Sequence, residues 1–122
     1  VDAMALNVDL APTMLDLAGI PVPAAMQGRS LKPLLEGKVP QDWRTEYFYE
    51  HHSVKDRIPP SEAVRTQRWK YIRWMEPNPL VEELYDLESD PLEEHNLLTD
   101  PKHADILKEL REKWAKYREE LR

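Results

Sequence analysis

The stretch AVRTQRWKYIRW at residues 63–74 constrains the fold of this chain more than any other part of it. Its pattern predicts a β-hairpin: a short strand that ends near Thr66, a polar turn at residues 67–68, and a second strand over residues 69–74. The two strands of a hairpin are neighbours in an antiparallel sheet. The centre of the chain therefore predicts an antiparallel sheet against which the other elements pack.

The second strand of this hairpin carries large apolar side chains on both faces. Because side chains alternate along a strand, Trp69 and Tyr71 are expected on one face. Ile72 and Trp74 are expected on the other face. Such a strand needs cover on both sides. One cover is predicted to come from this chain, and the other from something that the chain does not contain.

Two further strands and a helix complete the predicted second part of the chain. Alternation predicts strands over residues 46–50 and 82–87. The dipeptide Asp100-Pro101 predicts the start of a helix, with Asp as the cap and Pro in the first helical position. The apolar stripe of this helix consists of Ile106, Leu107, Leu110, Trp114, Tyr117 and Leu121. The predicted fold class is therefore α+β: a small antiparallel sheet of about four strands, packed against a C-terminal α-helix.

The first part of the chain predicts two short helices. Asp9 is the expected cap of the first helix, which ends at Gly19, and Ser30 is the expected cap of the second, over residues 31–36. Two short helices joined by a proline-rich segment bury little apolar surface by themselves. We therefore expect them to be the edge of a larger α/β domain.

The composition changes between these two parts. All three glycines lie within the first 37 residues, and every aromatic residue lies from Trp43 onward. This change places a boundary near residues 38–42, and it divides the chain into residues 1–40 and 41–122.

Composition also excludes several classes of function. The formal net charge of −6 and the pI of about 5.2 argue against nucleic acid and anionic membranes as partners. No apolar run approaches the roughly 20 residues that span a bilayer. The chain contains no cysteine, which excludes disulfides, thiolate metal sites and cysteine nucleophiles.

The adjacent histidines His51 and His52 are the first candidate site. Neighbouring residues on a strand point in opposite directions, and no third ligand follows at a recognisable spacing, so surface histidines are favoured over a metal site. The remaining alternative is that His51 reaches into a pocket with Glu50. The basic residues at 65–73 are favoured as solvated charge, because alternation lets only Arg65 and one partner share a face.

Other polar groups do not form a recognisable catalytic pattern. The acidic run at residues 82–90 lacks the glycine and the ordered spacing of an EF-hand. Ser53, Ser61 and Thr66 lack a plausible triad arrangement. The residues by themselves indicate an accessory domain and not a self-sufficient enzyme.

Five segments, taken in order, resemble the C-terminal end of a type I sulfatase. They are NVDLAPTMLDLAGIPVPAAMQGRSLKPLLEG, DWR, EAVRTQRWKYIRW, EELYDLESDPLEEHNL and the closing helix. Each motif alone is weak, but their order and spacing agree from about Asn7 to the last helix. The stretches FYEH at residues 48–51 and SEAVRT at residues 61–66 are similar to the bacterial branch that acts on sulfated sugars.

The resemblance implies that the chemistry lies outside this chain. The family has a large alkaline-phosphatase-like domain that carries a formylglycine and binds calcium, and neither motif occurs in this sequence. Residues 1–40 would be the severed edge of that catalytic domain, and residues 41–122 the C-terminal subdomain. No catalytic or metal-binding residue is therefore expected here, and calcium and formylglycine are implied only for the full-length parent.

The same resemblance implies partners and a site. The partners would be the missing N-terminal catalytic domain and a sulfated carbohydrate, in a periplasmic or secreted enzyme, and the isolated chain could dimerise through its exposed interface. Glu50, His51 and Arg65 are the expected contacts to the sugar or its anionic groups. Two alternatives stay open: a related phosphonate or phosphate ester hydrolase, and a stand-alone interaction domain.

Overall fold

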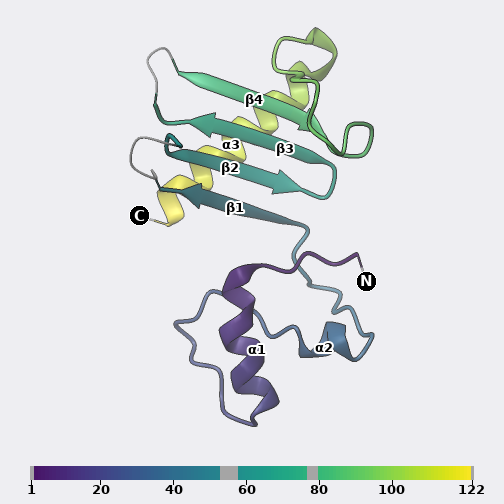
Figure 1. The fold of residues 1–122 in the computed structure, drawn as a ribbon, viewed down its shortest axis with the longest axis vertical. Coiled ribbons are helices and arrows are strands. Elements are labelled where there is room, and N and C mark those ends of the chain that lie inside the picture. Colours follow the sequence, from purple (N-terminus) through teal and green to yellow (C-terminus); the bar gives the residue numbers. More distant parts are fainter. Residues whose placement is uncertain (1, 53–57, 77–79, 122) are drawn as a thin grey trace. The chain divides into compact units, whose positions relative to one another are not determined.

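The computed structural model describes residues 2–52, 58–76 and 80–121 and contains two compact units, Val1–Thr45 and Glu46–Arg122 (Figure 1). The division after Thr45 lies a few residues beyond the predicted boundary at residues 38–42. Trp43 and Arg44 belong to the first unit because their side chains bond to residues near its start. The indole nitrogen of Trp43 donates to the carbonyl of Met4 at 2.9 Å. The candidate Ser53 and the predicted loop around Pro77 and Pro79 lie outside the described residues.

The first unit contains the two predicted short helices, α1 (Leu10–Leu17) and α2 (Lys32–Leu35), preceded by a 3-10 turn at Asn7–Asp9. The chain leaves these helices at Gly19 and Gly37, whose φ angles of 71° and 76° lie in the left-handed region that favours glycine.

The sequence predicted that Asp9 caps α1. Asp9 stands at the cap position, but its side chain makes no cap hydrogen bond. Its carboxylate is fully buried and accepts hydrogen bonds from the backbone amides of Leu6, at 2.7 Å, and Arg29, at 2.8 Å. Both terminal nitrogens of Arg44 also donate to it. Burial alone would raise the pKa of Asp9, but these hydrogen bonds outweigh it and hold the pKa below its usual value. Asp9 therefore links three separate segments of the first unit.

The second unit contains the predicted four-stranded antiparallel sheet, in the order β1-β2-β3-β4. Its strands are β1 (Glu46–His51), β2 (Ser61–Thr66), β3 (Trp69–Trp74) and β4 (Val81–Asp86). The turn between β2 and β3 falls at residues 67–68, as predicted. Thr66 fixes it, because its hydroxyl accepts from the amide of Trp69 at 2.9 Å. Each strand pairs with its neighbour along the chain, so the sheet is a simple meander.

One helix covers one face of this sheet (Figure 1). A 3-10 turn at Pro101–His103 leads into α3 (Ala104–Glu120), and Asp100 caps the turn by accepting from the amide of Lys102 at 2.9 Å. The buried core between sheet and helix consists of Val64, Tyr71, Leu84, Leu107, Leu110 and Trp114. Leu121, which the predicted stripe included, is 50% exposed because α3 ends before it.

Several polar side chains under the helix gather around Trp114, although the Nε atoms of Arg73 and Arg118 are buried without a hydrogen-bond partner among the described residues. The indole nitrogen of Trp114 donates to Glu62 at 2.8 Å. The guanidinium groups of Arg73 and Arg118 lie 4.2 and 5.1 Å from the centre of the Trp114 ring.

Within the described residues, no helix is long and apolar enough to cross a membrane.

Candidate functional site

The face of the sheet opposite α3 presents three rows of side chains, which the strand register defines. The first row is Tyr47, Arg65, Lys70 and Tyr85; the second is Tyr49, Ala63, Ile72 and Glu83; the third is His51, Ser61, Trp74 and Val81. Within its own unit this face is open, and we call it the open face. Ile72 and Trp74 lie on the open face, and Tyr71 lies on the face that α3 covers. The predicted alternation in β3 is therefore confirmed.

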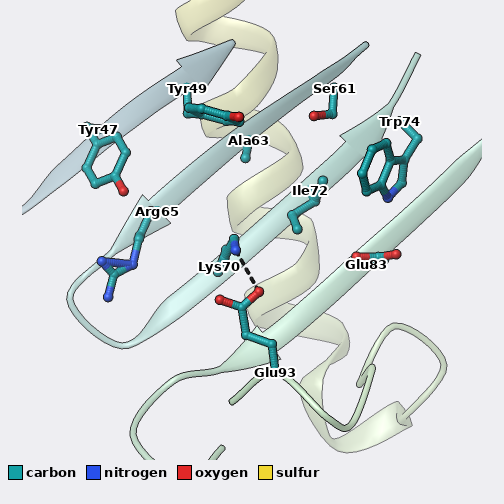
Figure 2. Close-up of a pocket in the computed structure, with 10 residues that line it drawn as sticks. All are labelled: Tyr47, Tyr49, Ser61, Ala63, Arg65, Lys70, Ile72, Trp74, Glu83 and Glu93. Atoms are coloured by element: carbon teal, nitrogen blue, oxygen red, sulfur yellow. Dashed lines mark hydrogen bonds and ion pairs between the residues drawn. The ribbon is translucent and has the colours of Figure 1, made fainter. Parts of the chain in front are cut away.

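A hollow of about 410 Å³ lies on this open face (Figure 2). We call it the open-face hollow; its lining residues are Tyr47, Tyr49, Ser61, Ala63, Arg65, Lys70, Ile72, Trp74, Glu83 and Glu93. It exists because Ala63 offers only a methyl group between the larger Tyr49 and Ile72. Small-molecule sites typically measure roughly 300–1,000 Å³ and combine apolar walls with a few polar groups. The size and lining of the open-face hollow fit that description.

Most charges of the open-face hollow are paired within the chain. The ammonium of Lys70 lies 2.6 Å from a carboxylate oxygen of Glu93 (Figure 2). Glu83 accepts a hydrogen bond from the hydroxyl of Tyr85 at 3.2 Å. Burial, and then the charge of Glu83, raises the pKa of Tyr85 to about 12, so this phenol keeps its proton. The guanidinium of Arg65 has no acceptor among the residues that the structure describes.

The three site residues expected from the sequence occupy two places. Arg65 lines the open-face hollow. Glu50 and His51 line a second hollow of about 250 Å³ at the end of β1, the strand-end hollow. Arg65 is paired in the sheet with Tyr47, which lies four residues before His51 on β1. About 13 Å of strand therefore separates Arg65 from His51. The structure brings Glu50 and His51 to one hollow and does not bring Arg65 to them.

The strand-end hollow contains a buried nitrogen that lacks a partner. It is lined by Glu50, His51, His52, Pro60, Ser61, Glu62, Met75 and Arg118. The Nε2 atom of His51 is buried and has no hydrogen-bond partner among the described residues. An unpaired buried polar atom is costly in a folded protein, and it is often found where a ligand or another polar group binds.

Sequence reasoning missed several residues of the open-face hollow. Alternation along β1 was a sufficient signal for Tyr47 and Tyr49, since the same period places Phe48 on the helix side. Glu93 gave no such signal, because it reaches the open-face hollow from a loop.

Within the described residues, no group of three or more His, Cys, Asp or Glu side chains is placed to hold a metal ion.

Comparison with known proteins gives consistent matches along most of the chain. The family model described as "N-sulphoglucosamine sulphohydrolase, C-terminal" matches residues 1–120. The N-acetylglucosamine-6-O-sulfatase of Bacteroides thetaiotaomicron is 43% identical over 117 residues, which cover 88% of this chain and 20% of that protein.

Solved structures give similar matches. A protein solved in complex with its substrate D-glucosamine-2-N,6-O-disulfate superposes with a TM-score of 0.85 at 36% identity, over 96% of this chain and 24% of that one. The phosphonate monoester hydrolase of Agrobacterium radiobacter superposes with a TM-score of 0.70 at 27% identity, over 92% of this chain and 24% of that one. The chain thus spans about a fifth to a quarter of the length of these proteins.

Proposed function

Because the chain belongs to the N-sulphoglucosamine sulphohydrolase C-terminal family, we propose that it is the C-terminal region of an enzyme that hydrolyses sulfate esters of sugars. The observation that carries the proposal is the family match over residues 1–120. The substrate class is supported by the match to an N-acetylglucosamine-6-O-sulfatase and by the match to a structure solved with D-glucosamine-2-N,6-O-disulfate. In this reaction water supplies the oxygen that ends on sulfur, and the sugar leaves as an alcohol.

We place the reaction centre in the catalytic domain of the parent enzyme. The family resemblance assigns a formylglycine and a calcium ion to that domain. The described residues of this chain do not fit a calcium site, because no three of their His, Cys, Asp or Glu side chains are placed to hold a metal ion and two carboxylates of the acidic run are paired with arginines. Glu82 pairs with Arg111 at 2.5 Å, and Asp86 with Arg68 at 2.8 Å. We derive no step of the reaction through either group.

The role proposed for this chain is to form part of the substrate cleft. Glu50 and His51 would meet the sugar at the strand-end hollow, and Arg65 would meet it on the open face. Among the described residues the buried Nε2 atom of His51 has no hydrogen-bond partner, which suits a sugar hydroxyl. The guanidinium of Arg65, which lines the open-face hollow, has no acceptor among the same residues and suits an anionic group.

Hydrolysis of a generic aryl sulfate tests the proposed function. The full-length gene product and this 122-residue chain are assayed side by side with 4-nitrophenyl sulfate. We expect turnover by the full-length protein only, because the reaction centre lies in the other domain. Turnover by the shorter chain, or none by either protein, would contradict the proposal.

Replacing His51 with alanine in the full-length enzyme tests the strand-end hollow. The loss of one hydrogen bond to the sugar is expected to lower kcat/KM on a sulfated sugar by roughly 3- to 10-fold. Thermal stability should not fall, because the Nε2 atom makes no hydrogen bond within the described residues. The matched control is His95→Ala, since the side chain of His95 is 78% exposed. Equal kcat/KM for His51→Ala and the unmodified enzyme would remove His51 from the site.

A phosphonate or phosphate ester hydrolase is the second candidate. The superposition on a phosphonate monoester hydrolase, with a TM-score of 0.70, favours it, although the sequence identity there is lower than for the sulfatase relative. Comparing kcat/KM on a sulfate ester and on a phosphonate ester with the same leaving group separates the two functions.

A further inference from the structure

Arg65 is the cation of the open-face hollow that has no counter-charge among the residues that the structure describes. Lys70, its neighbour in the first row, is neutralised by Glu93, and Glu83 is held by Tyr85. Glu93 reaches Lys70 from a backbone with a φ of 58°, a strained region for a residue other than glycine. The chain thus maintains a strained turn that neutralises Lys70, while Arg65 has no acceptor in the described part of the chain. A planar guanidinium in this state suits a sulfate or a carboxylate, which it can bind with two parallel hydrogen bonds.

The floor and wall beside Arg65 are apolar. Ala63, which is 2% exposed, and Ile72, which is 9% exposed, form the floor. Tyr49 is 45% exposed and stands at the side of the hollow, one row away from Arg65 (Figure 2). The ring of Tyr49 lies nearly parallel to that of His51, at 11°, and offers a flat apolar surface. Aromatic rings combine a large apolar area with a polar tip, and a saccharide ring has apolar C–H faces and polar edges that match this arrangement.

The charges of the open-face hollow suit the binding of a charged group that does not react. They do not suit the sulfate that is hydrolysed. A transition state that develops negative charge needs several donors and cations directed at one point. Within the described part of the chain, the open-face hollow has Arg65 as its one unpaired cation, and it also contains the carboxylates of Glu83 and Glu93. A single charge-assisted pair in such surroundings contributes affinity for a charged group that does not react.

We propose that the open-face hollow binds a saccharide whose ring lies over Ala63 beside Tyr49, and whose second charged group, distinct from the sulfate that is hydrolysed, pairs with Arg65. The proposal rests on the sulfatase function proposed above and extends it. The substrate then carries at least two anionic groups, the reacting sulfate and either another sulfate or a carboxylate.

The test compares Arg65→Gln with the unmodified full-length enzyme on two pairs of sulfated disaccharides. In one pair a uronate carboxylate is free or methyl-esterified, and in the other a second sulfate is present or replaced by a hydroxyl. The unmodified enzyme is expected to prefer the doubly charged member of at least one pair by roughly 10- to 100-fold in kcat/KM, the effect of one charge-assisted hydrogen bond. Arg65→Gln is expected to remove that preference. The pair that shows the effect identifies the charged group.

Two further variants sharpen the result. Lys116→Gln makes the same change of charge at a side chain that is 75% exposed on α3, and it should leave both preferences intact. Ala63→Leu fills the hollow and keeps Arg65, and it should lower kcat/KM for both members of each pair. Thermal unfolding of each variant shows whether the added bulk has disturbed the sheet instead.

Other occupants of the open face give different results. If the rest of the enzyme or a second copy of the chain covered this face, Arg65→Gln would lower the melting temperature and reduce kcat/KM equally for both members of each pair. That result, or an unchanged preference, would overturn the proposal. Binding titrations with the same disaccharides give a readout that does not depend on turnover. Failure of the sulfatase function alone would appear as absent hydrolysis with the charge preference still present in the dissociation constants.

Discussion

Replacing Asp9 with alanine is expected to destabilise the first unit by roughly 3–5 kcal/mol, the cost of leaving one partner of a buried ion pair alone. Asp9 is fully buried, and the side chain of Arg44 is only 13% exposed. The substitution would leave the guanidinium of Arg44 and the amides of Leu6 and Arg29 without their acceptor.

The loss can be measured by hydrogen exchange in the full-length protein. Leu31 is a suitable reporter, because its amide donates to the hydroxyl of Thr13 and not to Asp9. Its protection is expected to fall by roughly 10²- to 10⁴-fold, which corresponds to the loss of stability. Asp42→Ala serves as the control, since that carboxylate pairs with Arg29 but is 80% exposed. Similar exchange in both variants would contradict the assigned role of Asp9.

The same carboxylate makes the stability of the first unit depend on pH. The pKa of Asp9 is lower in the folded protein than in the unfolded chain, because hydrogen bonds from Arg44, Arg29 and Leu6 outweigh the effect of burial. Its contribution is therefore present above the unfolded pKa, about 3.9, and is lost as the pH falls through the lower folded-state pKa. The protection of Leu31 should fall over that acid range, and Asp9→Ala should lack this step.

Leu110→Ala is expected to destabilise the second unit by about 2–5 kcal/mol, because it removes a fully buried side chain and leaves a cavity between sheet and helix. Leu110 lies in the core cluster with Tyr71 of β3 and Leu84 of β4. Hydrogen exchange of the β3 amides in the full-length protein measures the effect, since β3 is a central strand of the sheet.

Leu121→Ala supplies the matched control for this prediction. It makes the same chemical change just beyond α3, at a side chain that is 50% exposed, and its effect should stay within about 0.5 kcal/mol. If Leu121→Ala weakened β3 protection as much as Leu110→Ala, the assigned end of the helix-covered core would be wrong.

The sheet was predictable because its signals are local. Alternation and a polar turn defined β2 and β3, and the prediction that Arg65 shares a face with one basic partner is confirmed by its pairing with Lys70. The role of Asp9 was not predictable, because its partners Arg29 and Arg44 lie 20 and 35 residues further along the chain. No local pattern reports a contact across such a separation.

The open-face hollow was predictable only in part for the same reason. Strand alternation determines which side chains of β1 and β3 reach the open face. The neutralisation of Lys70 depends on a turn conformation at Glu93 that the sequence does not signal, since neither glycine nor asparagine stands at that position. The contrast between a neutralised Lys70 and an Arg65 that finds no acceptor in residues 2–52, 58–76 and 80–121 therefore required the structure.

The order of elements along the chain has a consequence for synthesis of the protein. The four strands pair in sequence, so each hairpin can close as soon as its second strand leaves the ribosome. Their cover, α3, is translated last among these elements. The sheet surface that carries Val64, Tyr71 and Leu84 therefore stays uncovered until α3 emerges. During that interval a chaperone, or a neighbouring nascent chain, has access to the surface that later becomes the core.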